Sequence, residues 1–282
     1  MSILRTYDQD GFYLHYSFDY TPDPTDFWTH FHARYELLYV KKGKGRFICD
    51  GRVYRLFDGA VFLIKRGEVH RMEIDPTYPY ERMVFNFDHT LIDSVDRTGL
   101  LFEPFGKDHI VYTETTVTEV LDKLAGISPD VVGEGFRVRA ASILLSALSE
   151  IAAVYQREDK SLYDIGDMTG EHMSVRLAVK YIHDHLFLEM TLDDIAKAAF
   201  MSKSHISRLF RETTGKTIWG YITVKRLIAA KRMLSRGEPP AEVAAACGFR
   251  HYSTFWRSYQ KVFGTSPTEE RKNLSAGEPF PC

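Results

Sequence analysis

Residues 248–272 read GFRHYSTFWRSYQKVFGTSPTEERK, and they repeat, imperfectly, a pattern found earlier in the chain. A shift of 48 residues pairs Ala196 with Ala244, and beyond the turn a shift of 49 pairs Arg208 with Arg257. Each copy has a short helix with a small central residue, a tight turn, and a second helix with one apolar and one basic edge. A small residue lets two helices cross closely, so the repeat predicts two helix-turn-helix units.

The polar edges of the two second helices carry side chains suited to contacts with nucleic acid. Arg bridges guanine O6 and N7, Ser and Gln donate or accept at base edges, and Lys neutralises phosphates. The candidate DNA-contacting residues are Ser202, Lys203, Ser204, Ser207, Arg208 and Arg211 in the first copy, and Arg250, His251, Tyr252, Ser253, Trp256, Arg257 and Lys261 in the second.

The segment between the copies, IWGYITVKRLIAAKRMLS at residues 218–235, is predicted to form one helix of about 17 residues, or ~25 Å. A rigid spacer of that size could hold the two readers about one turn of DNA, ~34 Å, apart. One chain could therefore read an asymmetric site.

Composition and charge place this repeat in a larger chain. The 282 residues argue for roughly two domains. Residues 172–274 hold 17 Lys and Arg against 9 Asp and Glu, a formal charge of +8, while the remainder carries −10. A basic block on an acidic chain indicates that this block alone meets a polyanion.

The start lacks the features of a signal peptide and no run of 18 apolar residues occurs, so we expect a cytoplasmic protein without a membrane partner. The three cysteines show no CxxC spacing and indicate neither a disulfide framework nor a thiolate zinc site.

The region from Tyr7 to about Phe87 alternates apolar and polar residues between short turn signals. This pattern predicts an antiparallel β sandwich or barrel. The sequences KGKG, CDG and FDG are each predicted to mark a hairpin.

Helical periodicity follows, weakly from Thr116 to Ala125 and strongly from about Glu134 to Gln156. The second segment carries an apolar stripe that either packs on its own β domain or pairs with a second copy, and the sequence favours neither. Residues 157–172 are polar and aperiodic and are predicted to be a linker. The stripe consists of Ala141, Leu144, Leu148, Ile151 and Tyr155, widened by Leu145 and Ala152.

The C-terminal residues resemble the AraC/XylS family of bacterial transcription regulators. The family signature is similar to residues 248–272 through Gly248-Phe249, Ser253, Phe255, Arg257, Phe263-Gly264, Ser266-Pro267 and Arg271. The first copy matches through Ile195-Ala196, Ser202, Arg208-Leu209-Phe210 and Gly215, and the connecting helix through Arg226-Leu227, Ala230 and Met233-Leu234. The resemblance covers roughly 100 residues and implies a double helix-turn-helix that binds DNA.

The first domain resembles the cupin-like sensor of the same family. His30, His32, Glu36 and Gly43 form H-x-H-x3-E-x6-G, and Gly59, Gly67 and His70 match most of the second cupin motif. His30, His32, Glu36 and His70 are thus the ligand set that a divalent transition metal would need. Regulators of this family often use the barrel for an organic effector instead, and we favour that interpretation, with no cofactor required. The candidate effector-binding residues are Trp28, His30, His32, Glu36, Arg46, His70 and Arg82.

These features predict an α+β multidomain protein: a cupin-like β domain at residues 1–115, a helical dimerisation segment at 116–156, the linker at 157–172, the double helix-turn-helix at 173–274 and a tail at 275–282. We expect an effector-responsive regulator, an activator rather than an enzyme, that is a homodimer and whose partners are promoter DNA, RNA polymerase and a sugar or small anion. The alternative is a metal-dependent cupin enzyme, an oxygenase or isomerase, with a helical appendage. The basic repeat argues against that alternative, because an enzyme needs no groove-reading helices.

Overall fold

A computed structural model describes the chain apart from residues 1–2, 10–11, 24–26, 28, 94, 107–110, 113–114, 126–134, 158–169 and 274–282. Two compact units make up the chain, one of residues 1–49 and 53–167, the other of residues 50–52 and 168–282. The boundary after residue 167 falls within the stretch predicted to be a linker, whereas residues 50–52 belong to the second unit from inside the β region. Most of the predicted linker and the tail at 275–282 lie outside the described residues.

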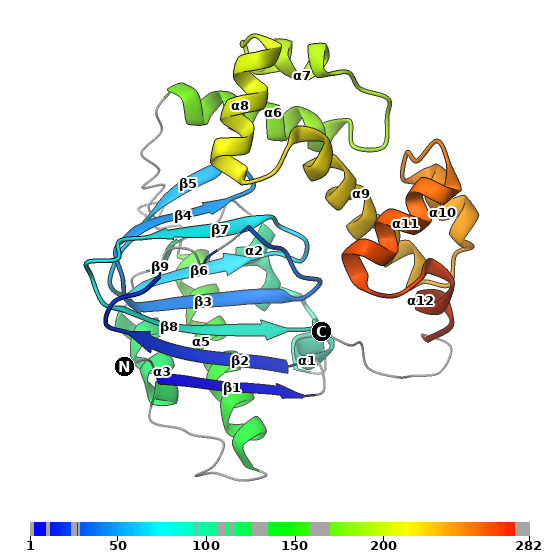
Figure 1. The fold of residues 1–282 in the computed structure, drawn as a ribbon. Helices are drawn as coiled ribbons and strands as arrows, with labels where there is room; N and C mark the ends of the chain where they lie inside the picture. Colours follow the sequence, from blue (N-terminus) through cyan, green and yellow to red (C-terminus); the bar gives the residue numbers. More distant parts are fainter. Residues whose placement is uncertain are drawn as a thin grey trace. The chain divides into compact units, whose positions relative to one another are not determined.

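The first unit contains two β sheets (Figure 1). The larger sheet has the order β1-β2-β8-β3-β6-β9, and its neighbouring strands pair in antiparallel fashion. The smaller sheet has the order β5-β4-β7. The strands are β1 (Ile3–Gln9), β2 (Phe12–Asp19), β3 (Tyr35–Lys42), β4 (Gly45–Cys49), β5 (Arg52–Leu56), β6 (Ala60–Ile64), β7 (His70–Ile74), β8 (Tyr80–Phe87) and β9 (Val111–Tyr112).

The predicted antiparallel β fold is confirmed, but two of the three predicted hairpins are wrong. Only CDG, between β4 and β5, connects neighbouring strands of one sheet. The KGKG and FDG turns connect strands of different sheets, so both are crossings between sheets. Their glycines Gly45 and Gly59 have φ of 142° and 85°, the left-handed region in which glycine is least strained. Glycine in a short turn therefore marks a change of direction without saying which strands it joins.

Helix α5 (Phe136–Gln156) packs against the large sheet together with α3 (Thr115–Ala125), and the short helices α1 (Thr90–Asp93), η2 (Leu100–Phe102) and α2 (Glu103–Gly106) follow β8. Its residues Leu144, Leu148 and Ile151 are fully buried in one cluster with Leu37 and Phe85 of the sheet. Each buried side chain contributes ~1.5–3 kcal/mol relative to exposure. The apolar stripe of α5 was predicted either to pack on its own β domain or to pair with a second copy. The structure supports packing on the β domain, and these three residues are not available to a second copy.

Helix α5 is also the one helix among the described residues that is long and apolar enough to cross a membrane. A core helix of a β domain has the same length and composition, and Leu144, Leu148 and Ile151 of α5 are buried in the core with the sheet.

The second unit is helical: α6 (Gly170–Asp184), α7 (Leu192–Ala198), α8 (Lys203–Thr214), α9 (Ile218–Leu234), α10 (Pro240–Ala246), α11 (Tyr252–Phe263) and α12 (Pro267–Asn273). Helix α9 has the 17 residues that its sequence predicts. Leu227, Ala230 and Leu234 of α9 are buried in one cluster with Phe255 and Tyr259 of α11. The connecting helix is thus part of the core of the second helix-turn-helix.

Candidate DNA-reading helices and sensor site

The first helix-turn-helix consists of α7 and α8, and polar caps fix both helix starts. Thr191 and Asp194 form a capping box, in which each side chain accepts a hydrogen bond from the backbone N–H of the other. Ser202 caps α8 by accepting from the backbone N–H of His205. Gly215, with φ of 71°, is the C-terminal cap of α8. In the second copy, α10 begins with Pro239 as its N-cap and Pro240 as its first residue, and Gly264, with φ of 72°, caps the C-terminus of α11.

Both copies have the same turn between their helices. In the first, the backbone N–H of Met201 donates to the carbonyl of Ala196, and in the second that of Phe249 donates to Ala244, both at 3.0 Å. Ala196 and Ala244 are 3% and 2% exposed, so the small residues lie at the helix crossings where the repeat predicts them.

The outward residues of α8 and α11 are placed as their sequence predicts. Ile206 and Phe210 of α8 and Phe255 and Tyr259 of α11 are fully buried, so the opposite faces remain accessible. Ser207 and Trp256 are half-buried. The exposed candidates are Ser202, Lys203, Ser204, Arg208, Arg211, Arg250, His251, Tyr252, Ser253, Arg257 and Lys261.

Three of these cations form ion pairs with acidic side chains of the same chain. Arg208 lies 3.4 Å from Glu212, and Lys203 lies 3.0 Å from Asp193. Exposed pairs of this kind contribute ~0–1 kcal/mol. They cost little to break, and a phosphate or a guanine edge can therefore replace the carboxylate.

Arg226 of α9 connects the two copies, a role that the sequence did not reveal. Its guanidinium donates to the carbonyls of Leu186 at 2.8 Å and Leu188 at 2.9 Å, which precede α7, and to that of Gly248 at 2.7 Å, which follows α10. Arg250 of the second copy adds an ion pair to Glu189, at 2.8 Å. Arg presents its donors in a rigid planar fork, so Arg226 holds two backbone segments, residues 186–188 and Gly248, against α9.

We call the first unit the sensor unit. Three of the four predicted metal ligands, His32, Glu36 and His70, come together in it where β3, β7 and the segment before β3 meet. The Nε2 atom of His32 lies 2.6 Å from Glu36 Oε2, and that of His70 lies 3.9 Å from Glu36 Oε1. Asn86, opposite Glu36 in the β3–β8 register, donates to Glu36 Oε2 at 2.8 Å. The side chains of Glu36 and His70 are 5% and 1% exposed. The ligand atoms of His32, Glu36 and His70 all lie within 4.8 Å of one another.

Backbone carbonyls orient both imidazoles in this cluster. His32 Nδ1 lies 2.8 Å from the Arg34 carbonyl, and His70 Nδ1 lies 2.9 Å from the Glu68 carbonyl. A carbonyl only accepts hydrogen bonds, so each Nδ1 carries a proton and each Nε2 faces Glu36. Nε2 of His70 is buried and has no hydrogen-bond partner among the residues that the structure describes.

The charges in the cluster follow from these contacts. Burial opposes the charged forms of His32 and Glu36, but their mutual attraction and hydrogen bond outweigh it. The pKa of His32 is therefore raised, and that of Glu36 is lowered to about 2. Burial lowers the pKa of His70 to about 3, against the opposing attraction of Glu36, so His70 is neutral at pH 7.

The remaining effector candidates are dispersed. His30 forms a β-bridge with His70, and its ring packs edge-on against His70 at 4.3 Å between centroids, but it is not part of the three-residue cluster. Arg82 lies opposite Ser17 in the sheet and donates to its hydroxyl at 3.3 Å. The predicted effector-binding role of Arg46 does not fit its position: its side chain is 56% exposed and forms an ion pair with Glu73, its register partner on β7. Trp28 lies outside the described residues.

Sequence reasoning missed Asn86 and His15, which the strand period could have found. Asn86 follows Arg82 by four residues and so shares its face of β8. His15 pairs with Val84 in the same register, between Arg82 and Asn86. Burial, together with the charge of Arg82, lowers the pKa of His15 to about 4.

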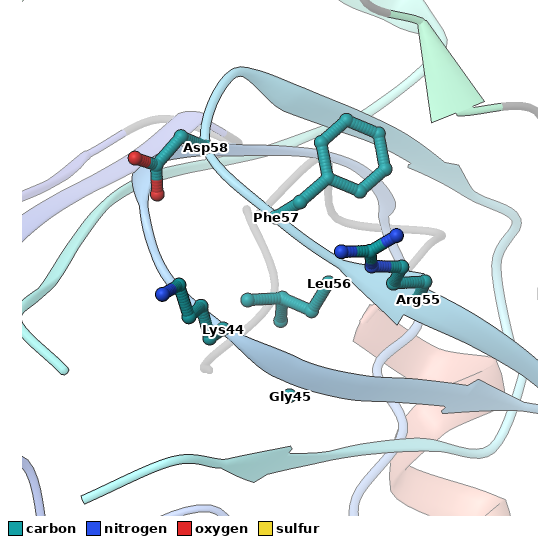
Figure 2. Close-up of a pocket in the computed structure, with 6 residues that line it drawn as sticks. All are labelled: Lys44, Gly45, Arg55, Leu56, Phe57 and Asp58. Atoms are coloured by element: carbon teal, nitrogen blue, oxygen red, sulfur yellow. The ribbon is translucent and has the colours of Figure 1, made fainter. Parts of the chain in front are cut away.

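A pocket of about 380 Å³ opens elsewhere in the sensor unit, where Leu56 lies between the side chains of Lys44 and Arg55 (Figure 2). Gly45, Phe57 and Asp58 complete its lining. Lys44 follows the end of β3, whereas Glu36 stands near its start, and strands rise ~3.3 Å per residue. The pocket is therefore separate from the histidine cluster.

Comparison with known proteins gives two family matches. The family described as AraC-like ligand binding domain matches residues 16–148, and the helix-turn-helix domain family matches residues 195–273.

Three curated relatives match different lengths of the chain. The "Probable transcriptional regulator LumQ" of Photobacterium leiognathi is 29% identical over 45% of this chain, which spans about half (51%) of that protein. The Msm operon regulatory protein of Streptococcus mutans is 22% identical over 97% of this chain and 98% of its own length. The HTH-type transcriptional activator RhaR of Mannheimia succiniciproducens is 23% identical over 87% of each chain. All three are named as regulators, and none of these names indicates an enzyme.

Proposed function

This chain belongs to the AraC/XylS family of transcription regulators, and from that premise we propose that it reads promoter DNA with α8 and α11 and responds to a small-molecule effector held by its β domain. The proposal rests mainly on the repeated geometry of the two helix-turn-helix units, each of which buries an apolar face and exposes a basic face. A single unit of this kind is common, but two that share one connecting helix suit a two-part site on one duplex.

We propose that the effector binds in the sensor unit, on the face of β8 that carries Arg82 and Asn86, beside Glu36 and His15, which the strand register brings together. These side chains include donors and acceptors at neutral pH, which suits a sugar or a small anion. An effector bound there would act by favouring one presentation of the DNA-reading unit over another. Activation, a cytoplasmic location, a homodimer and contact with RNA polymerase belong to the same proposal, and the name of the activator RhaR supports the first of these.

The test uses the full chain and a duplex that it selects itself from a random-sequence library. Binding is followed by fluorescence anisotropy at several salt concentrations. We expect enrichment of one sequence, with a specific affinity at least 10³-fold above that for unrelated DNA. Replacement of an exposed arginine outside the repeat, Arg139→Ala in α5, serves as the charge-matched control and should leave binding unchanged. Failure to enrich any sequence would overturn the proposal.

A further inference from the structure

We propose that His32, Glu36 and His70 form a binding site for one divalent transition-metal ion in the sensor unit. This proposal differs from DNA reading and effector response, because it concerns binding of a metal ion. That binding can be measured without DNA and without an effector. Two imidazole nitrogens and one carboxylate converge from two strands and the segment before them, with their ligand atoms within 4.8 Å of each other. Two nitrogens and one oxygen suit Zn²⁺, Fe²⁺ and similar ions.

The first argument is the unpaired nitrogen of His70. Its Nδ1 donates to the Glu68 carbonyl, so the lone pair of its Nε2 points toward Glu36 Oε1 at 3.9 Å. Nitrogen and oxygen both present lone pairs there, in a place with almost no exposure. An unsatisfied buried acceptor costs ~1–3 kcal/mol, and a cation between the two atoms satisfies both.

The second argument is the support behind the ligands. Metal-binding histidines almost always donate their other ring N–H to a carbonyl or carboxylate, which fixes the tautomer and the ring plane. His32 and His70 both do so, to the carbonyls of Arg34 and Glu68. Glu36 is likewise fixed, by the amide of Asn86. Each of the three ligands therefore has its own supporting contact.

The third argument concerns distance. A metal bonds nitrogen and carboxylate oxygen at ~2.0–2.2 Å, so two atoms on one ion lie at most ~4.2 Å apart. The 3.9 Å between His70 and Glu36 fits already. The 2.6 Å between His32 and Glu36 is a hydrogen bond whose proton the ion would replace, so this pair must open. The three ligand atoms lie within 4.8 Å of one another, so the cluster must also contract around the ion to bring every pair within that limit.

Such an ion could bind the proposed effector directly. Three protein ligands leave coordination positions for water or for a carboxylate or hydroxyl oxygen of a small molecule. The polar face that carries Arg82 and Asn86 adjoins the cluster through the pairing of Asn86 with Glu36. The class of ligand expected at the ion is thus an oxygen donor.

The experiment uses the full chain, purified without a histidine tag and stripped with chelator. Zn²⁺ is titrated by calorimetry, and Co²⁺ is followed by its visible absorption. We expect one Zn²⁺ per chain, and a Co²⁺ spectrum that Zn²⁺ abolishes. Glu36→Gln and His70→Asn should each weaken Zn²⁺ binding at least 100-fold. His185→Asn is the matched control, because His185 lies between α6 and α7 in the other unit, where its ring stacks on Tyr181 and its Nδ1 bonds to the Tyr181 carbonyl.

Circular dichroism of each stripped variant checks that it is folded. If His70→Asn does not fold, the near-isosteric Glu36→Gln variant decides. The titration of the unmodified chain needs no variant: no uptake of Zn²⁺ or Co²⁺ at micromolar concentrations would overturn the proposal. Equal affinity in Glu36→Gln and the unmodified chain would overturn it as well, since the ion would then bind elsewhere.

Discussion

The two helix-turn-helix copies make the same turn with different residues, and the difference shows what the second copy does in addition. The turn needs one residue in the left-handed region: Phe200, with φ of 55°, in the first copy and Gly248, with φ of 76°, in the second. Phe200 is 86% exposed, so its side chain has space and only backbone strain opposes it. A Cβ at Gly248 would lie 2.9 Å from the guanidinium carbon of Arg226 and 3.1 Å from the Phe187 carbonyl oxygen.

The turn at Gly248 therefore also binds the connecting helix α9 through Arg226, whereas the turn at Phe200 only joins α7 to α8. Arg226 approaches Gly248 closely because no side chain is in the way, and it takes the Gly248 carbonyl as one of its three acceptors. Two copies of one motif can thus share a fold while one of them also fixes the distance and angle between both.

The largest expected effect is on stability at the two turns. Gly248→Ala should destabilise the chain by about 3 kcal/mol, because it adds left-handed strain and displaces Arg226 from its acceptors. Phe200→Gly, at the equivalent position, should stabilise by up to ~1 kcal/mol through relief of strain. Urea denaturation of both variants measures the difference. Equal effects at the two positions would contradict the comparison.

The next effect concerns Arg226 itself. Arg226→Lys keeps the charge but loses the planar fork, and we expect a loss of about 2 kcal/mol in stability. It should also relax spacing: the unmodified chain should discriminate strongly against a selected duplex lengthened by one base pair at its centre, and the variant less so. Anisotropy titrations with the two duplexes measure the ratio. An unchanged ratio would show that α9 alone sets the spacing.

Arg208 and Arg257 are equivalent residues of the two readers. Arg208→Ala and Arg257→Ala should each cost ~1–3 kcal/mol on the selected duplex, as loss of a bidentate base contact does. Affinity for unrelated DNA should fall much less. If only one variant loses specific affinity, one copy reads bases and the other only positions the protein.

The smallest effect is expected for Lys261, exposed at the end of α11. Lys261→Ala should weaken binding to all sequences alike and reduce the salt dependence of log K by roughly 0.9, the contribution of one phosphate contact. Titrations at four salt concentrations give this slope. A loss confined to the selected duplex would instead make Lys261 a base-reading residue.

The DNA-reading unit was the more predictable part of the molecule. Its signals are local: Thr191 with Asp194, the two prolines at the start of α10, and helical periodicity each act within a few residues. The role of Arg226 was not predictable in this way, because its acceptors at Leu186 and Gly248 lie 40 and 22 residues away in loops.

In the sensor unit, spacing identified His32, Glu36 and His70 but not their arrangement. The motif also included His30, which the bridge to His70 holds beside the cluster. Arg46, a separate effector candidate, is exposed and pairs with Glu73. The orientation of each imidazole depends on carbonyls two residues away, at Arg34 and Glu68, whose direction follows from the folded backbone alone. The turn glycines had the same ambiguity, which is why two sheet crossings were predicted to be hairpins.

The central claim, that one chain reads two sites with α8 and α11, is tested most directly by footprinting the full chain on its selected duplex. The account predicts two protected major-groove segments about one turn, ~10 base pairs, apart on one face. Arg208→Ala should remove protection from one segment and Arg257→Ala from the other. A single protected segment, or two segments that both variants weaken alike, would contradict it.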